Sequence, residues 1–363
     1  MNSNNYCIIM AGGTGTRFWP LSTKSKPKQF LDILGTGRSL LQMTFDRFKK
    51  ICPVKNIFIV TNERYNKVIK EQLPELSDNQ VLLEPAKKNT APCIAYANYK
   101  IQGINPDANI VVSPADHLIL DETKFIKNIE EGLFFTSKND ALLTLGIQPT
   151  RAETGYGYIQ INEEKEVKDS ENIYKVKTFT EKPDKELAQK FYESGEFFWN
   201  SGIFIWSLKS IQAAFKKYLS DVDELFAEGV DKFNTEEEHD FISKVYFNCK
   251  SISIDYGIME KADKVFVYVS KFGWADLGTW SSLQEHLDND KNNNAIHGKN
   301  VLTYDVKNSF INFKDEKLVV IKGLDNYIIV ESDDKLLIYK KEDEQEIKEI
   351  VNKLENEKGS EYV

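Results

Sequence analysis

A glycine-rich segment near the N-terminus combines residue types and spacing that could do chemistry. Residues 11–17 read Ala-Gly-Gly-Thr-Gly-Thr-Arg. Glycine backbone can approach a ligand closely, and successive N–H groups can form a nest for an anion. Arg17 adds a guanidinium that can bind phosphate oxygens in a bidentate manner. The spacing matches neither the G-x-G-x-x-G fingerprint nor a Walker A loop. It favours phosphate binding of another kind, and a plain strand-to-helix turn is the structural alternative.

Lysines follow this segment closely. Lys24, Lys26 and Lys28 form, with Arg17, a cationic patch that suits a triphosphate, and solvated surface lysines are the alternative. The whole chain of 363 residues is acidic, with 47 Lys and Arg against 56 Asp and Glu. A field of this sign repels polyanions, so we expect no nucleic acid and no anionic membrane as partner. The local patch can still bind a small anionic ligand, because a cluster of Lys and Arg opposes the net charge at short range.

These residues carry a resemblance to a known family. The run A-G-G-x-G-x-R-x-x-P-L-S over residues 11–22, followed by P-K-Q-F-L over residues 27–31, resembles the signature of sugar-nucleotide pyrophosphorylases, specifically the mannose-1-phosphate guanylyltransferases. Glucose-1-phosphate uridylyl- and thymidylyltransferases share the first half and usually differ in the lysine segment, so Gln29 and Phe30 favour the mannose branch. The resemblance implies a Rossmann-like nucleotidyltransferase (GT-A-like) fold and Mg²⁺ as cofactor.

A second segment resembles the family's base-binding motif. Residues 84–92 are similar to E-P-x-x-R-N-T-A-P, which contacts guanine, and Glu84 would accept from guanine N1–H and N2–H₂. Lys88 stands where the family often has Arg, which puts a planar contact in doubt. For Asn89 and Thr90 a helix cap is the alternative. The predicted nucleotide-binding residues are Ala11, Gly12, Gly13, Thr14, Gly15, Arg17, Lys28, Glu84, Pro85, Asn89 and Thr90.

Two aspartates are the magnesium ligands that the resemblance implies. Asp116 follows an apolar run and matches the Asp of P-S-D-H, and Asp276 matches that of W-x-D-x-G-x-W. Mg²⁺ takes carboxylate oxygens and often shares its site with substrate phosphates. A lone Asp is more often a cap, so the metal role depends on the resemblance. The predicted catalytic residues are Arg17, Lys28, Asp116 and Asp276.

Four further segments match the family around the sugar phosphate. They are residues 154–159, 181–183, 199–202 and 253–260. Without the resemblance, a β-turn at Gly157 and a surface ion pair of Glu181 with Lys182 would be the better interpretation. The predicted substrate-binding residues are Gly157, Glu181, Lys182, Asn200 and Asp255.

Together these motifs predict an enzyme that converts GTP and α-D-mannose 1-phosphate into GDP-mannose and diphosphate, by Mg²⁺-assisted in-line attack on the α-phosphorus. Its product would serve GDP-mannose and polysaccharide biosynthesis. One alternative is a related transferase that takes another sugar or nucleotide. Another is a regulatory subunit that binds sugar nucleotide without turnover. Longer family members carry an isomerase domain, and since no His-rich metal segment is present after residue 294, we expect no isomerase activity.

The pattern of apolar residues predicts how these motifs are positioned. Short β-rich runs alternate with apolar-periodic helical segments, which predicts an α/β fold with a mixed, mainly parallel sheet and flanking helices. The runs are 6–11, 57–61, 81–83, 109–113 and 141–145, and the helical segments are 39–51, 62–73 and 90–103. Ser39 and Asn62 are expected N-caps. The loops after residues 11, 83 and 113 should meet at one rim of the sheet.

We predict a catalytic domain over residues 1–287 and a small β-rich module over 295–363 that ends in a helix, with the polar residues 288–294 as linker. The sequence shows no strong internal repeat. The module is expected to pack on the first domain or to mediate a homodimer. The four cysteines lack C-x-x-C spacing, and no apolar run is long enough for a signal peptide or a membrane span. We therefore expect a cytoplasmic protein.

Overall fold

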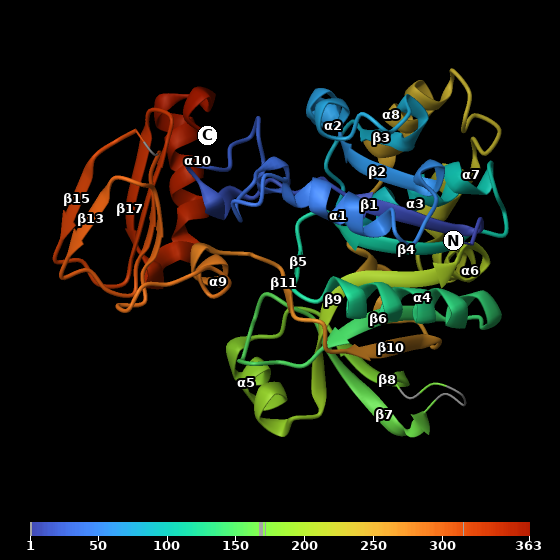
Figure 1. Ribbon diagram of the computed structural model, residues 1–363. Coiled ribbons are helices and arrows are strands. Elements are labelled where there is room, and N and C mark those ends of the chain that lie inside the picture. Colours follow the sequence, from blue (N-terminus) through green and yellow to red (C-terminus); the bar gives the residue numbers. More distant parts are fainter. Residues whose placement is uncertain (1, 167–169, 171, 315) are drawn as a thin grey trace. The chain divides into compact units, whose positions relative to one another are not determined.

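The computed structural model describes residues 2–166, 170, 172–314 and 316–363 (Figure 1). The chain forms two compact units. Unit 1 comprises Met1–Gly12, Thr44–Ala115 and Ile119–Trp274, and unit 2 comprises Gly13–Met43, Asp116–Leu118 and Ala275–Val363. This division differs from the predicted domains 1–287 and 295–363. The physical reason is a hydrophobic cluster in which side chains of residues 13–43, such as Phe18 and Leu40, pack with Trp280 and Phe310.

Unit 1 is built on a nine-stranded sheet in the order β3-β2-β1-β4-β9-β6-β10-β8-β7. Only β9 and β8 run against the other strands, since β9 is antiparallel to β4, β6 and β7, and β8 is antiparallel to β10 and β7. The predicted mixed, mainly parallel sheet is confirmed. The strands are β1 Asn5–Met10, β2 Ile57–Asn62, β3 Val81–Glu84, β4 Asn109–Pro114, β6 Leu142–Ile147, β7 Tyr158–Glu166, β8 Ile173–Thr180, β9 Phe197–Ser207 and β10 Val265–Ser270.

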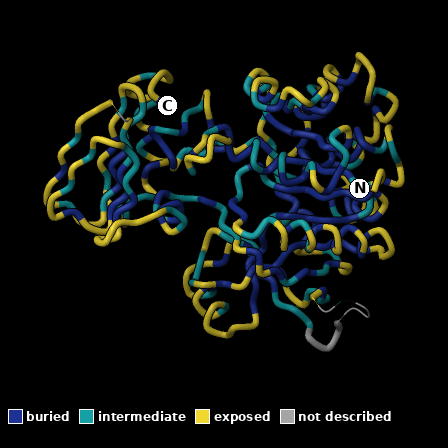
Figure 2. The backbone as a smooth tube through the Cα atoms, in the orientation of Figure 1, coloured by how far each residue is buried: buried dark blue, intermediate teal, exposed yellow. Residues whose placement is uncertain are grey.

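Helices flank this sheet, and Figure 2 shows the buried strands in dark blue beneath helices with exposed outer faces. Tyr6 and Ile8 of β1 share one hydrophobic core with α3, α6, α7 and α8. Ser39 and Asn62 accept backbone N–H bonds from Gln42 and Arg64, as N-caps do. The helices are α1 Leu40–Phe48, α2 Asn66–Gln72, α3 Thr90–Gln102, α4 Glu122–Lys138, α5 Lys185–Ser194, α6 Leu208–Tyr218, α7 Ser220–Ala227 and α8 Glu238–Asn248.

Most of unit 2 is a parallel β-helix followed by a helix. Val301 pairs with Val319 and Phe310 with Ile328, so one coil takes 18 residues. The coils repeat in backbone geometry and share few residues, so the sequence shows no strong internal repeat although the fold is repetitive. The elements are α9 Trp280–Gln284, β12 Ala295–His297, β13 Val301–Tyr304, β14 Phe310–Asn312, β15 Val319–Lys322, β16 Tyr327–Ser332, β17 Lys335–Lys340 and α10 Ile347–Lys358, and the short strands β5 Leu118–Ile119 and β11 Trp274–Ala275 complete the fold.

The residues predicted to form a linker, 288–294, are an ordered turn that enters the first coil. Asp290 accepts from the backbone N–H groups of Asn292 and Asn294. The Asn294 side chain is buried and bonds to the backbone of Val306 and Ser309. In the described residues no helix has the length and apolar character that a membrane crossing needs.

Candidate active site

The five predicted sugar-phosphate residues come together in unit 1 from four separate segments. A Cβ atom added at Gly157 would lie 2.4 Å from Glu181 Oε2 and 3.2 Å from Asn200 Cβ. The backbone carbonyl of Gly157 accepts from Asn200 N at 2.8 Å. Asn200, on β9, donates through Nδ2 to Asp255 Oδ1 at 2.8 Å, and Asp255 begins a short π-helical turn, Asp255–Met259. A side chain at position 157 would therefore displace the Glu181 carboxylate.

This cluster contains two carboxyl groups, of Glu181 and Asp255, and one ammonium group, of Lys182. Burial and the neighbouring charge of Glu181 raise the pKa of Asp255 to about 7. Burial also raises the pKa of Glu181, against the ion pair at 3.1 Å with Lys182 Nζ. Glu181 Oε2 is buried and finds no hydrogen-bond partner among the described residues. An oxygen in this state suits a hydroxyl donor, because an unmet buried acceptor is costly.

Glu84, the predicted base-contacting residue, lies at the carboxyl end of β3 and is buried. Its Oε1 accepts from the Tyr246 hydroxyl at 2.9 Å, and its Oε2 would lie 3.4 Å from a Cβ added at Gly12, just after β1. Burial raises the pKa of Glu84 to about 7, although the Tyr246 hydrogen bond and the charge of Lys87 lower it. Near neutral pH this group therefore exchanges between acid and carboxylate.

The residues after Glu84 have structural roles here. Asn89 caps α3 by accepting from Thr90 N at 2.9 Å, and its φ of 70° is left-handed. Thr90 Oγ1 accepts from Ile254 N at 2.9 Å and so joins the start of α3 to the segment that leads into Asp255. The structure contains the cap at Asn89, and a role of Asn89 and Thr90 in nucleotide binding stays a prediction. Pro85 is half-buried beside them.

The phosphate-loop residues from Gly13 onward lie in unit 2 and fold tightly on Lys28. Gly15 has a φ of 57°, and a Cβ there would lie 2.6 Å from Lys28 Cβ, so only glycine fits. Gln29 Nε2 donates to Gly13 O at 2.9 Å, and Ser22 Oγ donates to Thr14 O at 3.2 Å. These bonds hold the loop's carbonyl groups within the protein, and Arg17 is exposed.

Lys28 connects the two predicted metal ligands, all within unit 2. Its Nζ lies 2.7 Å from Asp116 Oδ2 and donates to the backbone oxygens of Asp276 at 2.9 Å and Leu277 at 3.0 Å. An ammonium group has three donors, so these contacts use all of them. Burial alone would raise the pKa of Asp116, but the charges of Lys28 and His117 hold it below its ordinary value. The structure thus brings together three of the four predicted catalytic residues.

These residues fit a magnesium ion that is also bound by substrate. Mg²⁺ commonly takes one or two protein carboxylates together with phosphate oxygens. The lowered pKa of Asp116 favours its carboxylate form, and the side chain is partly exposed. Asp276 Oδ1 accepts from Gly278 N at 3.0 Å, which orients its carboxylate. Within the described residues no group of three or more His, Cys, Asp or Glu side chains could hold a metal by itself.

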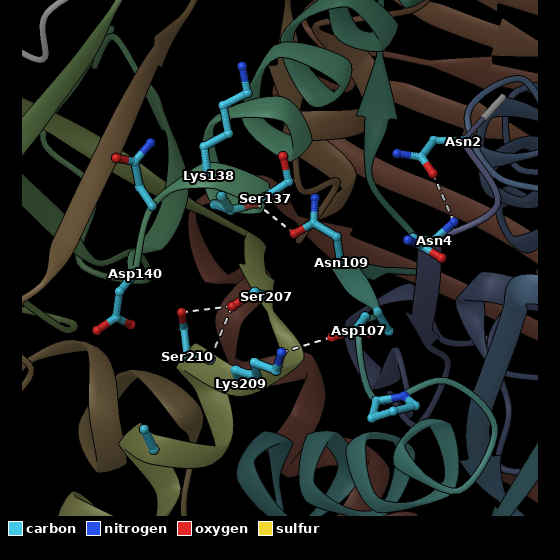
Figure 3. Close-up of a pocket in the computed structure, with 15 residues that line it drawn as sticks. Asn2, Asn4, Asp107, Asn109, Ser137, Lys138, Asp140, Ser207, Lys209 and Ser210 are labelled. Atoms are coloured by element: carbon cyan, nitrogen blue, oxygen red, sulfur yellow. Dashed lines mark hydrogen bonds and ion pairs between the residues drawn. The ribbon is translucent and has the colours of Figure 1, made fainter.

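A cavity of about 580 Å³ in unit 1 is lined by none of the predicted site residues (Figure 3). Asn4 and Asn109, at the amino ends of β1 and β4, belong to its lining. Ligand sites in such sheets lie beyond the carboxyl ends of the strands. Lys209, which lines this cavity, is paired with Asp107 at 2.8 Å. This cavity is therefore not the candidate active site.

Two supporting residues were missed by sequence reasoning. Tyr246 lies in α8, where its apolar neighbours make it look like an ordinary core residue. Thr144 in β6 contacts Asn200 Oδ1 through its hydroxyl at 2.9 Å and is fully buried. A threonine in an apolar strand carries no distinctive signal, since β-branched residues are common there.

Residues 6–293 match the family model described as nucleotidyl transferase, and residues 299–354 match the MannoseP isomerase/GMP-like beta-helix domain. Fold and site thus define a nucleotidyl transferase, an enzyme class of sugar-nucleotide biosynthesis. The mannose-1-phosphate guanylyltransferase of Escherichia coli is 35% identical over 98% of this chain and 76% of its own length. That of Klebsiella pneumoniae is 36% identical over 98% of this chain and 75% of its own. The chain belongs to the mannose-1-phosphate guanylyltransferase family, which confirms the predicted family and activity class.

Solved structures agree on the fold. A protein described as mannose-1-phosphate geranyltransferase from Thermus thermophilus has a TM-score of 0.86 and 27% identity, over 97% of this chain and 99% of that one. The mannose-6-phosphate isomerase of Helicobacter pylori has a TM-score of 0.61 over 75% of this chain and 99% of that one. Its identity of 24% limits that likeness to the fold.

Proposed function

We propose that this protein transfers the GMP group of GTP to α-D-mannose 1-phosphate and releases diphosphate. The observation that carries the proposal is the contact of Lys28 Nζ with Asp116 and with the backbone of Asp276, residues that are far apart in the sequence. A cationic group that pairs with one carboxylate and holds the backbone of a second aspartate suits a triphosphate with its metal ion. The names of relatives that match 98% of this chain support a guanylyl group as the transferred group and mannose 1-phosphate as the acceptor.

Positioning and charge stabilisation carry the reaction. An oxygen of the mannose phosphate attacks the α-phosphorus of GTP, a new P–O bond forms, and the bond to the bridging β-phosphate oxygen breaks, so that diphosphate leaves with its electron pair. A phosphate monoester has a second pKa of about 6, so the nucleophile is already ionised near neutral pH. The protein therefore needs no general base and must hold two anions in line.

The loop of unit 2 is proposed to bind the triphosphate. The backbone N–H groups near Gly13 and the guanidinium of Arg17 would donate to phosphate oxygens. The ammonium of Lys28 would exchange a backbone partner for a phosphate oxygen, because its three donors are all used in this structure. Asp116 and Asp276 would hold Mg²⁺, whose charge neutralises phosphate oxygens when it is bound.

Unit 1 is proposed to bind the base and the sugar phosphate. Glu84 would accept from guanine N1–H and N2–H₂. Glu181 Oε2, which lacks a described partner, would accept from a mannose hydroxyl, and the exposed ammonium of Lys182 would bind the sugar's phosphate. Asn200 and Asp255 would complete the sugar contacts.

We further propose a cytoplasmic homodimer that associates through the β-helix. Leu302 and Val320 are cross-strand neighbours, and their side chains are 48% and 61% exposed. Tyr304 and Leu318 extend this apolar face. Apolar patches of this kind on a protein surface commonly mark association sites. A location in the cytoplasm agrees with GTP as a substrate.

Diphosphate release tests the proposed function. The purified protein is assayed with Mg²⁺ and each of GTP, ATP, UTP and dTTP, paired with mannose 1-phosphate or glucose 1-phosphate. Release confined to GTP with mannose 1-phosphate supports the proposal. Preference for another pair would indicate the related transferase. Absence of release from a folded protein that binds GDP-mannose would indicate the regulatory subunit.

A further inference from the structure

A buried polar contact fixes the carboxylate of Glu84. Tyr246 is fully buried on α8, and its hydroxyl donates to Glu84 Oε1 at 2.9 Å across 162 positions of sequence. A buried hydroxyl cannot turn to water, so this bond defines the orientation of the carboxylate. The other oxygen, Oε2, lies on the side of Gly12, directly after β1.

Tyr246 is itself held in place by its surroundings. Its ring packs edge-on against Tyr96 of α3, with 6.5 Å between the ring centroids. The Tyr96 hydroxyl donates to Glu238 Oε1 at 2.9 Å, and Glu238 is paired with the buried ammonium of Lys100 at 2.5 Å. The Tyr96 hydroxyl therefore donates to Glu238, and the Tyr246 hydroxyl donates the hydrogen bond that orients Glu84.

We propose that Tyr246 is a positioning residue for guanine selection, because it fixes Glu84 with Oε2 toward Gly12 and favours its acceptor form. This inference rests on the proposed role of Glu84 in binding the base. Guanine presents the donors N1–H and N2–H₂. A carboxylate can accept hydrogen bonds from both on its two oxygens, whereas in a protonated carboxyl one oxygen carries an O–H donor. A hydrogen bond to the charged form favours that form, so the Tyr246 hydroxyl keeps more Glu84 ionised near neutral pH.

The groups that face Glu84 sharpen this expectation. The titratable and charged groups that interact with it are Lys87, Cys93, Tyr96 and Tyr246. Burial raises the pKa of the Cys93 thiol and of both tyrosines well above their ordinary values, so these stay protonated near neutral pH. Burial raises the pKa of Glu84 to about 7, so Glu84 itself titrates in this range.

The test uses full-length Tyr246→Phe, which removes only the hydroxyl. Losing a hydrogen bond to a carboxylate moves the titration of Glu84 to higher pH. We expect the KM for GTP to rise about tenfold at pH 6.5 and to return to within about threefold of wild type at pH 8.5. The kcat and the KM for mannose 1-phosphate should stay within about twofold.

Two further variants separate positioning from packing. Tyr96→Phe removes a buried hydroxyl from the neighbouring ring and should leave the pH profile for GTP unchanged, even if the protein melts earlier. Glu84→Gln should raise the KM for GTP at every pH. In the Glu84→Gln background, adding Tyr246→Phe should introduce no further pH dependence of this KM, because its effect acts through the Glu84 carboxylate.

The outcomes distinguish this inference from the proposed function. If the wild type is active and Tyr246→Phe has the same pH profile of KM for GTP as the wild type, the positioning role is wrong and the proposed function stands. The same conclusion follows if Tyr96→Phe gives the profile of Tyr246→Phe. A wild type that releases no diphosphate from GTP overturns both.

Discussion

The ammonium of Lys28 lies 2.7 Å from a carboxylate oxygen of Asp116, although 88 positions separate the two residues in the sequence. Lys28 is 4% exposed. A buried ion pair of this kind gives little net stability, since desolvation offsets the attraction. Its further contact with the backbone of Asp276 agrees with the role in triphosphate and metal binding that we propose for these residues.

Replacing Lys28 with methionine should lower kcat more than tenfold, because the variant keeps the shape of the side chain and loses the charge that we assign to the triphosphate. It should also lower the free energy of unfolding by about 1 kcal/mol, because Asp116 loses its partner but its carboxylate is partly exposed to water. Steady-state kinetics and urea unfolding measure both. Lys67→Met, at an exposed position in α2, is the control and should behave like wild type. Wild-type turnover in Lys28→Met would contradict the assignment.

Gly157→Ala should raise the KM for mannose 1-phosphate strongly and change that for GTP little. The added methyl would lie 2.4 Å from Glu181 Oε2, so the carboxylate that we assign to the sugar must move. Gly155→Ala in the same loop approaches only the side chain of Glu153, at 3.3 Å, and serves as control. Equal KM values for the two variants would argue against a sugar site at this cluster.

Asp255 should make the protein less stable as the pH rises. Its pKa is about 7 in the folded state and near 4 in an unfolded chain, so between these values the folded state holds a proton that the unfolded state has released. The free energy of unfolding therefore falls across this window. Asp255→Asn should make the fall shallower between pH 5 and pH 8, while Glu84 keeps part of it, since its pKa is also raised. Asp240→Asn, at an exposed site in α8, should keep the wild-type slope. Denaturant titrations at several pH values in this range measure how the free energy of unfolding changes with pH in each variant.

Val320→Lys should convert a dimer into a monomer of 41.8 kDa, as measured by light scattering after gel filtration. The lysine would place a charge opposite Leu302 on the apolar face of the β-helix. Ile104→Lys removes a similarly exposed apolar side chain from unit 1 and should leave the mass unchanged. A wild-type protein that is already monomeric would refute the proposed dimer.

Local patterns predicted much of the fold. The runs at 57–61 and 109–113 became β2 and β4, and the periodic segment at 90–103 became α3. These predictions succeeded because apolar periodicity and capping are local properties. The β-helix was missed because its coils share few residues. Asn308 and Asn326 repeat at the same point of the coil, both with left-handed backbone, but such isolated matches are weak signals.

The sequence predicted candidate residues of the site, and it did not predict the contacts between them. Separate motifs predicted Lys28, Asp116 and Asp276. Only the folded chain shows that the Lys28 ammonium contacts the carboxylate of Asp116 and the backbone oxygen of Asp276. Tyr246 had no motif at all, because its importance comes from a neighbour that lies 162 positions away. Partnerships of this kind depend on long-range packing, which local patterns do not encode.

The fate of the α-phosphate tests the central claim most directly. The protein is incubated with Mg²⁺, mannose 1-phosphate and GTP that carries a radioactive label on the α-phosphorus, and the products are separated. In-line attack at that atom predicts that all transferred label appears in GDP-mannose and none in the released diphosphate. Label in the diphosphate, or label that stays in GTP while the enzyme is folded and saturated, would contradict the account.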